Sequence, residues 1–261
     1  MSTLDFRNEF HGNNLMFQKK SKGLFAEVSA YEIRLARTDR SVNPLQVEAF
    51  KAIPVTSEDE ARRAVENFVG EQKSSFRQAV CAVYPTDRFL HRFTTENAAR
   101  TKSEGFATKV VTEELKRTPG DTSFRVLYPA NGKSYKPKES LSRDLLFVGA
   151  GKSAIREEQS RVLGFGLYPT HLRLASISLY EGTRRAVIEE GSESSTLVLE
   201  FSEHSAYVYV VNAGGLALSH SINFGISGIT ERIQTELGLQ DALSARKVLF
   251  SATFDFRDMA T

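Results

Sequence analysis

The sequence predicts an α/β protein with mixed sheets, built from two similar halves of three strands and a helix, with a small α+β subdomain inserted between them. Three observations support this prediction. Two segments, 24–50 and 196–222, each place apolar residues in short strand-like runs. Apolar residues at helical spacing follow each segment. Residues 89–141 interrupt the pattern with turn residues and basic side chains.

Composition is typical of a soluble globular protein and excludes several classes. Of 261 residues, 41% are hydrophobic and 25% charged. The net charge of only +2 argues against a dedicated nucleic-acid binder. No apolar run is long enough to span a membrane, and the first 22 residues lack the apolar core of a signal peptide. Cys81 is the single cysteine, which excludes an internal disulfide and fits the reducing cytoplasm.

The first half begins after residues 1–22, a polar segment that we predict to be a flexible tail. Alternation predicts a hairpin and a third strand over residues 24–50. Ser57 and Glu60 have the spacing of a capping box, so a helix is expected to begin there. The apolar run at 79–84 does not alternate, which is typical of a strand covered on both faces.

The middle of the chain is expected to leave the main sheet and then return to it. Residues 95–117 predict one long polar helix, and residues 123–128 a strand that ends at a turn. The apolar run 145–148 predicts a buried strand that resumes the main pattern. Two helices are expected after it, at 153–163 and near 171–180.

These elements suggest a division into domains. The first domain would comprise residues 23–88 and 142–180, with residues 89–141 as the inserted small subdomain. Residues 181–261 would form the second domain.

A weak internal duplication connects the two halves. The tripeptides Glu27-Val28-Ser29 and Glu200-Phe201-Ser202 each end the first strand of a predicted hairpin, at a similar distance before a helix. Internal repeats are strong indicators of architecture. Two such halves that face one another would bring these two turns opposite each other across a cleft.

Motifs for common chemistries are incomplete. Gly149-Ala150-Gly151-Lys152-Ser153 resembles the end of a phosphate-binding P-loop, but the required first glycine is replaced by Leu146. A tight strand-to-helix turn is the better interpretation, although Lys152 at a helix N-terminus could attract an anion. The five histidines are scattered without ligand spacing, and Cys81 lies in an apolar run. We therefore predict no catalytic residue and no metal site.

The order of elements resembles the actin-like (ribonuclease-H-like) fold, and specifically the PilM family of type IV pilus assembly proteins, with GspL and FtsA as related families. The resemblance runs from about Met16 to the C-terminus and begins with Met16-Phe17-Gln18-Lys19-Lys20 before a strand. The insert and the segments 145–167 and 196–249 follow in register. The match is one of pattern and order. PilM-like chains continue with a further subdomain, so we expect that this chain is truncated at its C-terminus.

The resemblance implies that the two hairpin turns correspond to phosphate loops, which in this family usually read D-x-G. There the aspartate positions Mg²⁺, and the glycine lets the backbone approach phosphate. This chain reads E-x-S at both places, which implies a degenerate site for ATP and Mg²⁺. The positions implied are Glu27, Ser29, Glu200, Ser202, Gly228 and Lys247. The alternative is that the turns only connect strands.

The resemblance also implies a protein partner. PilM-type proteins hold the cytoplasmic tail of PilN, a single-span inner-membrane protein, between the first subdomain and the insert. Phe89, Phe93 and Phe106 lie in the predicted insert and could line such a groove. The alternative is that these three rings form the core of the small subdomain.

The implied function is a cytoplasmic scaffold for a type IV pilus or a type II secretion-like platform. It would reach the inner membrane through its partner, without inserting itself, and self-association is compatible with this role. An active actin-like ATPase and an FtsA-like division protein remain alternatives. Intact D-x-G loops would favour the ATPase, and an amphipathic membrane-targeting helix would favour the division protein.

Overall fold

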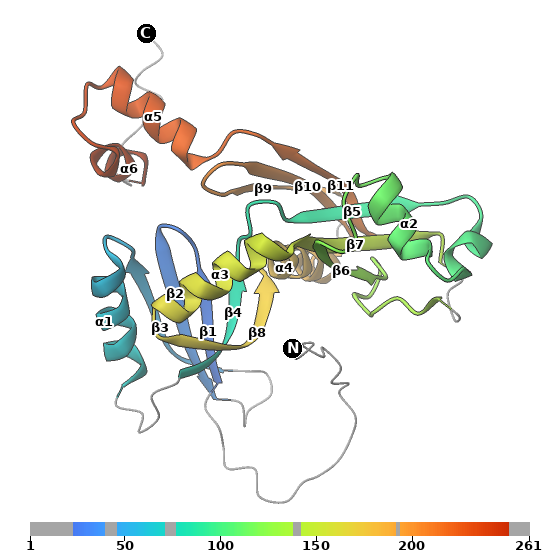
Figure 1. Ribbon diagram of the computed structural model, residues 1–261, viewed down its shortest axis with the longest axis horizontal. Helices are drawn as coiled ribbons and strands as arrows, with labels where there is room; N and C mark the ends of the chain where they lie inside the picture. The colour runs from blue at the N-terminus through green and yellow to red at the C-terminus, as the bar shows by residue number, and fades with distance from the viewer. Residues whose placement is uncertain (1–22, 40–45, 71–76, 138–141, 192–193, 251–261) are drawn as a thin grey trace, which may run out of the picture.

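A five-stranded mixed sheet forms the first half of the molecule. The computed structural model describes residues 23–39, 46–70, 77–137, 142–191 and 194–250, and Figure 1 shows their arrangement. The strands of this sheet, in the order in which they pair, are β3 (Gln46–Pro54), β2 (Glu32–Asp39), β1 (Gly23–Val28), β4 (Arg77–Val83) and β8 (Leu167–Leu174). The first three form an antiparallel meander, whereas β4 and β8 run parallel to β1. This order confirms the predicted mixed sheet.

Helices α1 (Glu58–Val69) and α3 (Lys152–Gly164) pack on this sheet. The Oγ atom of Ser57 accepts a hydrogen bond from the Glu60 backbone N–H, so the predicted helix start is confirmed. Val65 of α1 and Val162 of α3 are fully buried against β-strand residues, including Cys81. Burial of these side chains holds the first half together.

The inserted small subdomain contains a second sheet. Its strands are β5 (Phe89–Thr94), β6 (Thr122–Leu127) and β7 (Asp144–Gly151), with β7 in the centre and antiparallel to both neighbours. The strand predicted to resume the main sheet therefore belongs to the insert. The sheet of the small subdomain therefore extends to Gly151, past the expected boundary at residue 141. The reason is that β7 pairs with both β5 and β6 and lies between them.

Two other sequence predictions in this region were wrong. The long helix expected at 95–117 is a short 3-10 helix, η1 (Ala98–Lys102), followed by α2 (Phe106–Glu113). Gly105 separates them because its φ of 80° lies in the left-handed region, which interrupts a helix. The helix expected near 171–180 begins later, as α4 (Ala175–Glu189), because the preceding residues pair with β4 as strand β8.

The second half repeats the meander of the first. Strands β9 (Thr196–Phe201), β10 (Ala206–Asn212) and β11 (Gly215–Ile222) pair antiparallel in the order β11-β10-β9, which matches β3-β2-β1. Helices α5 (Ile226–Glu236) and α6 (Ala242–Phe250) follow. The predicted succession of three strands and a helix is thus present twice.

Helix α4 and a shared core connect the parts. Helix α4 contacts β4 and β8 of the first sheet as well as β9 and β10 of the third. Buried side chains from the small subdomain, such as Leu146, pack with Tyr180 of α4 and Tyr209 of β10 in one cluster. In Figure 1 the second half lies above the five-stranded sheet and beside the small subdomain. None of the helices within the described ranges is long and apolar enough to cross a membrane.

The packing of Cys81 predicts an unreactive thiol. Its side chain is fully buried, and burial raises the pKa of the thiol to about 12. Since the thiolate is the reactive form, Ellman's reagent should not label the native protein within minutes. It should label one thiol per chain in concentrated guanidinium chloride, because Cys81 is the only cysteine. Rapid stoichiometric labelling of the native protein would contradict the described packing.

Candidate functional site

The two hairpin turns singled out from the sequence have the same construction. In the turn between β1 and β2, the Ser29 N–H and Oγ both donate to the Glu32 carbonyl, at 3.0 and 2.9 Å. In the turn between β9 and β10, the Ser202 N–H and Oγ both donate to the Ser205 carbonyl, at 2.8 Å each. Each serine hydroxyl thus closes its own two-residue loop, as an ST-turn does.

The second turn is held from behind by the start of α5. The Ile226 N–H donates to the Ser202 carbonyl at 3.0 Å, and the Ser227 N–H to the Glu203 carbonyl at 2.9 Å. A Cβ at Gly225 would lie 2.4 Å from the Glu203 carbonyl oxygen, so only glycine permits this approach. The corresponding contact in the first half is a hydrogen bond from the Val55 N–H to the Tyr31 carbonyl.

The structure brings the two turns opposite each other, and side chains join them. Tyr31 belongs to the first turn and Glu203 to the second. The Arg246 guanidinium from α6 lies over the Tyr31 ring, 4.1 Å from its centroid, and 3.6 Å from Glu203 Oε1. Burial, together with the Glu203 carboxylate, raises the pKa of the Tyr31 hydroxyl. The predicted arrangement of facing turns is present, and a cation–π contact and an ion pair bridge it.

Glu200, on β9 just before the second turn, forms a buried ion pair with Arg88. The Arg88 side chain is fully buried, and its Nη2 atom lies 3.1 Å from Glu200 Oε1. The Ser176 hydroxyl donates to the same oxygen at 2.9 Å, and the Tyr209 hydroxyl donates to Oε2 at 2.7 Å. Both carboxylate oxygens of Glu200 therefore have partners within the protein.

Arg88 has partners on every side of its guanidinium. Its Nε donates to the Ser176 hydroxyl at 2.9 Å, and its Nη1 donates to the Pro85 carbonyl at 3.1 Å. The Tyr207 ring stacks against the guanidinium with its centroid 4.0 Å away. The network is complete, as a buried charge pair requires.

The first carboxylate is paired as well. The Tyr84 hydroxyl donates to Glu27 Oε1, and Arg34 Nη1 lies 3.5 Å from Glu27 Oε2. Burial raises the pKa of the Tyr84 hydroxyl, and the bond to Glu27 raises it further. Glu27 is half-buried, so this pairing is more exposed to water than that of Glu200.

The remaining predicted nucleotide residues lie in the second half. Gly228 is in the first turn of α5, where a Cβ would lie 3.3 Å from the Phe224 ring. Lys247 is exposed in the last turn of α6. Neither Gly228 nor Lys247 is among the partners of Glu200 or Glu27 described above.

The residues present do not fit a magnesium–nucleotide site in this arrangement. Mg²⁺ binds through carboxylate oxygens that are open to it, but those of Glu200 accept hydrogen bonds from three side chains. The hydroxyls of Ser29 and Ser202 are used within their own turns. Across the described ranges, no group of three or more His, Cys, Asp or Glu residues is placed to hold a metal.

The glycine-rich segment before α3 is a strand-to-helix turn. A Cβ at Gly151 would lie 2.3 Å from Asp87 Oδ2, and the Gly151 N–H donates to that carboxylate at 2.8 Å. The Lys152 ammonium donates to the Gly120 carbonyl at 2.6 Å, so it is engaged by the small subdomain. Glycine at position 151 lets the backbone lie against the Asp87 carboxylate. The resemblance to a P-loop does not predict this contact.

The three candidate partner-binding rings are core residues. Phe89, Phe93 and Phe106 are each exposed by less than a tenth and belong to the core of the small subdomain. The Phe93 and Phe106 rings meet edge to face, with their centroids 5.3 Å apart. This is the alternative that the sequence left open, although Phe93 also borders a hollow of about 370 Å³ at the end of β5.

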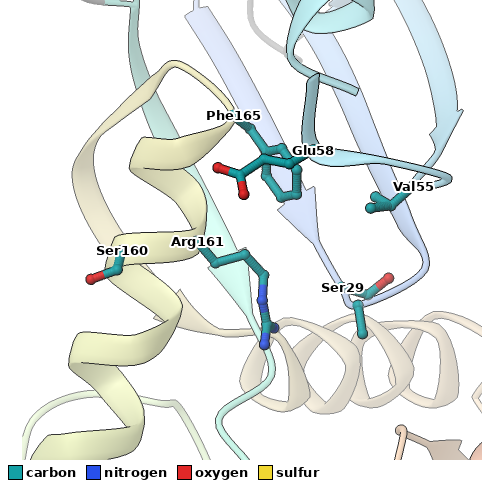
Figure 2. Close-up of a pocket in the computed structure, with 7 residues that line it drawn as sticks. Ser29, Val55, Glu58, Ser160, Arg161 and Phe165 are labelled. Atoms are coloured by element: carbon teal, nitrogen blue, oxygen red, sulfur yellow. The ribbon is translucent and has the colours of Figure 1, made fainter. Parts of the chain in front are cut away.

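A hollow of about 530 Å³ lies beside the first turn, between α1 and α3. Figure 2 shows Ser29 on one side of it and Arg161 on the other, with Glu58 and Phe165 above them. Arg161 Nη1 also donates to both oxygens of buried Glu158, at 2.9 and 3.0 Å. Sequence reasoning missed this hollow and Arg88, because a single charged residue next to an apolar run carries no motif.

Comparisons with solved structures show the fold of the chain, which is an actin-like α/β fold. The chain matches no protein-family profile and no curated protein. Among solved structures it is similar to a chain of the PilM-PilN type IV pilus biogenesis complex, with a TM-score of 0.64 at 17% identity, covering 88% of this chain and 69% of that one.

Two further solved structures are similar at lower scores. One is the cytoplasmic domain of EpsL from the type II secretion system of Vibrio cholerae, with a TM-score of 0.46, 12% identity, and coverage of 78% of this chain and 71% of that one. The other is a Bacteroides thetaiotaomicron protein with an actin-like ATPase fold, with a TM-score of 0.44, 12% identity, and coverage of 86% and 78%. The predicted resemblance to PilM is thus confirmed at the level of the fold.

The matched construction of the two turns predicts matched effects of mutation. Ser29→Ala and Ser202→Ala each remove a hydroxyl that closes a loop, and each should lower the free energy of unfolding by about 1 kcal/mol. The two losses should add in the double variant, because each serine hydroxyl bonds only within its own turn. Chemical denaturation measures both, with Ser123→Ala at an exposed strand position as the control. A large loss at one turn and none at the other would contradict their equivalence.

Glu158 predicts a pH-dependent effect on stability. Burial raises the pKa of its carboxyl above the usual 4.5, although Arg161 opposes this shift. The folded state therefore binds more protons here than the unfolded state, and stability is lost as pH rises through the folded pKa. Glu158→Gln, which cannot ionise, should gain stability relative to the original protein as the pH is raised above the ordinary carboxyl pKa of 4.5. Exposed Glu231→Gln should show no such trend, and a loss that grows with pH at Glu158 would contradict the assignment.

Proposed function

We propose that this protein is a non-catalytic PilM-like scaffold. It binds the cytoplasmic tail of a single-span inner-membrane protein similar to PilN and so organises a type IV pilus or type II secretion-like platform at the cytoplasmic face of that membrane. The observation that carries the proposal is the shared fold with PilM from a PilM-PilN complex, over 88% of the chain. The partner's span supplies membrane attachment in this scheme.

The contacts of the carboxylates beside the two facing turns support a role without catalysis. Phosphoryl transfer is catalysed largely by positioning and by charge stabilisation from metal ions. Here the carboxylate at the second turn is paired with Arg88, and the one at the first turn with Tyr84 and Arg34. Because these carboxylates bind side chains of the same protein, they do not bind the metal ion that phosphoryl transfer needs. We therefore expect the protein to hold partners and not to turn over nucleotide.

The hollow beside the first turn is the proposed site for the tail. Val55 and Phe165 give it an apolar part, and Glu58 and Arg161 give it charges of both signs. Sites for extended peptides combine apolar contact with a few polar groups that fix orientation. Phe89, Phe93 and Phe106 instead pack in the core of the small subdomain.

Peptide binding tests the scaffold proposal. The probe is a synthetic peptide with the cytoplasmic tail of a PilN-like protein from the same genome, labelled for fluorescence anisotropy. The protein should bind it, and Arg161→Ala should weaken binding about tenfold, because one charged contact is worth roughly 1–2 kcal/mol. Arg232→Ala, an exposed arginine on α5, should bind as the original does. No binding of any such tail would contradict the proposed partner class.

Calorimetry tests the alternative of an active ATPase. Mg-ATP and Mg-ADP are expected to give no heat of binding in the micromolar range, because the carboxylate and hydroxyl groups of both turns are engaged. Thermal denaturation with and without nucleotide provides an independent readout. Micromolar binding would contradict the non-catalytic proposal and favour an actin-like ATPase.

A further inference from the structure

The Arg88–Glu200 ion pair joins segments that are 112 residues apart in the chain. Arg88 follows β4 of the first half and immediately precedes the small subdomain, whereas Glu200 lies on β9 of the second half. Ser176 of α4 bonds both partners. The pair is therefore a connection between the halves, where the segment after β4 meets α4 and β9.

The pairing is costly to disrupt on either side. A buried charge without its partner is strongly unfavourable, because it has lost its hydration and has no opposite charge to compensate. Glu200 is exposed by only 6%, and the Arg88 side chain by 0%. The Arg88 and Glu200 side chains can stay paired only while the two halves stay together.

The segment 84–88 ties three parts of the molecule. Tyr84 bonds Glu27 near the first turn, and Arg88 bonds Glu200 in the second half. Between them, Asp87 accepts from the Gly151 N–H and pairs with Arg117 of the small subdomain at 3.3 Å. Movement of any one part would strain the contacts of the others.

We propose that Arg88 is a built-in cation that keeps the two halves closed on each other without a metal or a nucleotide. The guanidinium supplies, from within the chain, the positive charge that the Glu200 carboxylate needs. Its planar fork matches Glu200 Oε1 and Ser176 on one side and the Pro85 carbonyl on the other, while Tyr207 covers its face. This inference concerns the contact between the two halves and does not depend on the identity of the partner.

Chemical rescue tests the proposal on the full chain. Arg88→Ala leaves a cavity lined by Glu200, Ser176 and Tyr207, which matches a guanidinium ion. The variant should lose on the order of 10 °C in its thermal midpoint. Millimolar ethylguanidinium should restore several degrees of this loss, whereas ethylurea, which has a similar shape but no charge, should not. Rescue by both, or by neither, would overturn the proposal.

Arg232→Ala is the matched control, because its side chain is 81% exposed and pairs only at the surface with Glu236. Its midpoint should hardly change, and ethylguanidinium should not raise it. The same additive on the original protein corrects for general solvent effects. A rise of equal size in the control would mean that the rescue is not specific to the cavity.

Glu200→Gln provides a second test if Arg88→Ala does not fold. Glutamine keeps the volume of the side chain but removes the charge that Arg88 needs. Amides of the second turn, 202–205, and of the segment 84–88 should exchange hydrogen at least tenfold faster, while those of β1 and β2 keep their protection. Uniform acceleration throughout the chain would indicate loss of global stability only and would overturn the closing role. Peptide binding is measured separately, so failure of the scaffold proposal remains distinguishable.

Discussion

The buried ion pair between Arg88 and Glu200 is the constraint on which the arrangement of the whole molecule depends. The first half can form its own core, and the small subdomain has a core of its own. The buried tyrosines of the second half, Tyr207 and Tyr209, share a core with residues of β5 and β7. Helix α4 and this shared cluster hold the second half against the rest of the molecule. The polar contact at Arg88 restricts its orientation further, because charges buried this deeply accept very few geometries.

Local pattern was enough to predict most elements of the fold. The capping box at Ser57 and the two meanders follow from residue spacing alone. The pairing of strands was harder to predict, since an apolar run such as 145–148 does not reveal which sheet it joins. Strand β7 joins the small subdomain because β5 and β6 flank it, and that choice depends on contacts distant in sequence. The same limit explains the misplacement of β8 as a helix.

The candidate site was predictable only in part. The equivalence of the two turns could be read from two tripeptides, and the structure shows the same hydrogen bonds in both. Arg88 could not be found in this way, because its role arises from a carboxylate 112 residues later. A buried arginine is recognised by its partners, and a single sequence does not contain their positions.

The E-x-S tripeptides acquire a physical explanation from these contacts. From a comparison with D-x-G loops, the longer acid and the serine indicate only a lost nucleotide site. In the structure the Glu200 side chain extends to Arg88, Ser176 and Tyr209, and the Ser202 hydroxyl closes the hairpin. The Glu200 carboxylate and the Ser202 hydroxyl thus bind groups of the same protein. The glutamate and the serine of the second tripeptide therefore both hold the second half in place, the first through Arg88 and the second within its own turn.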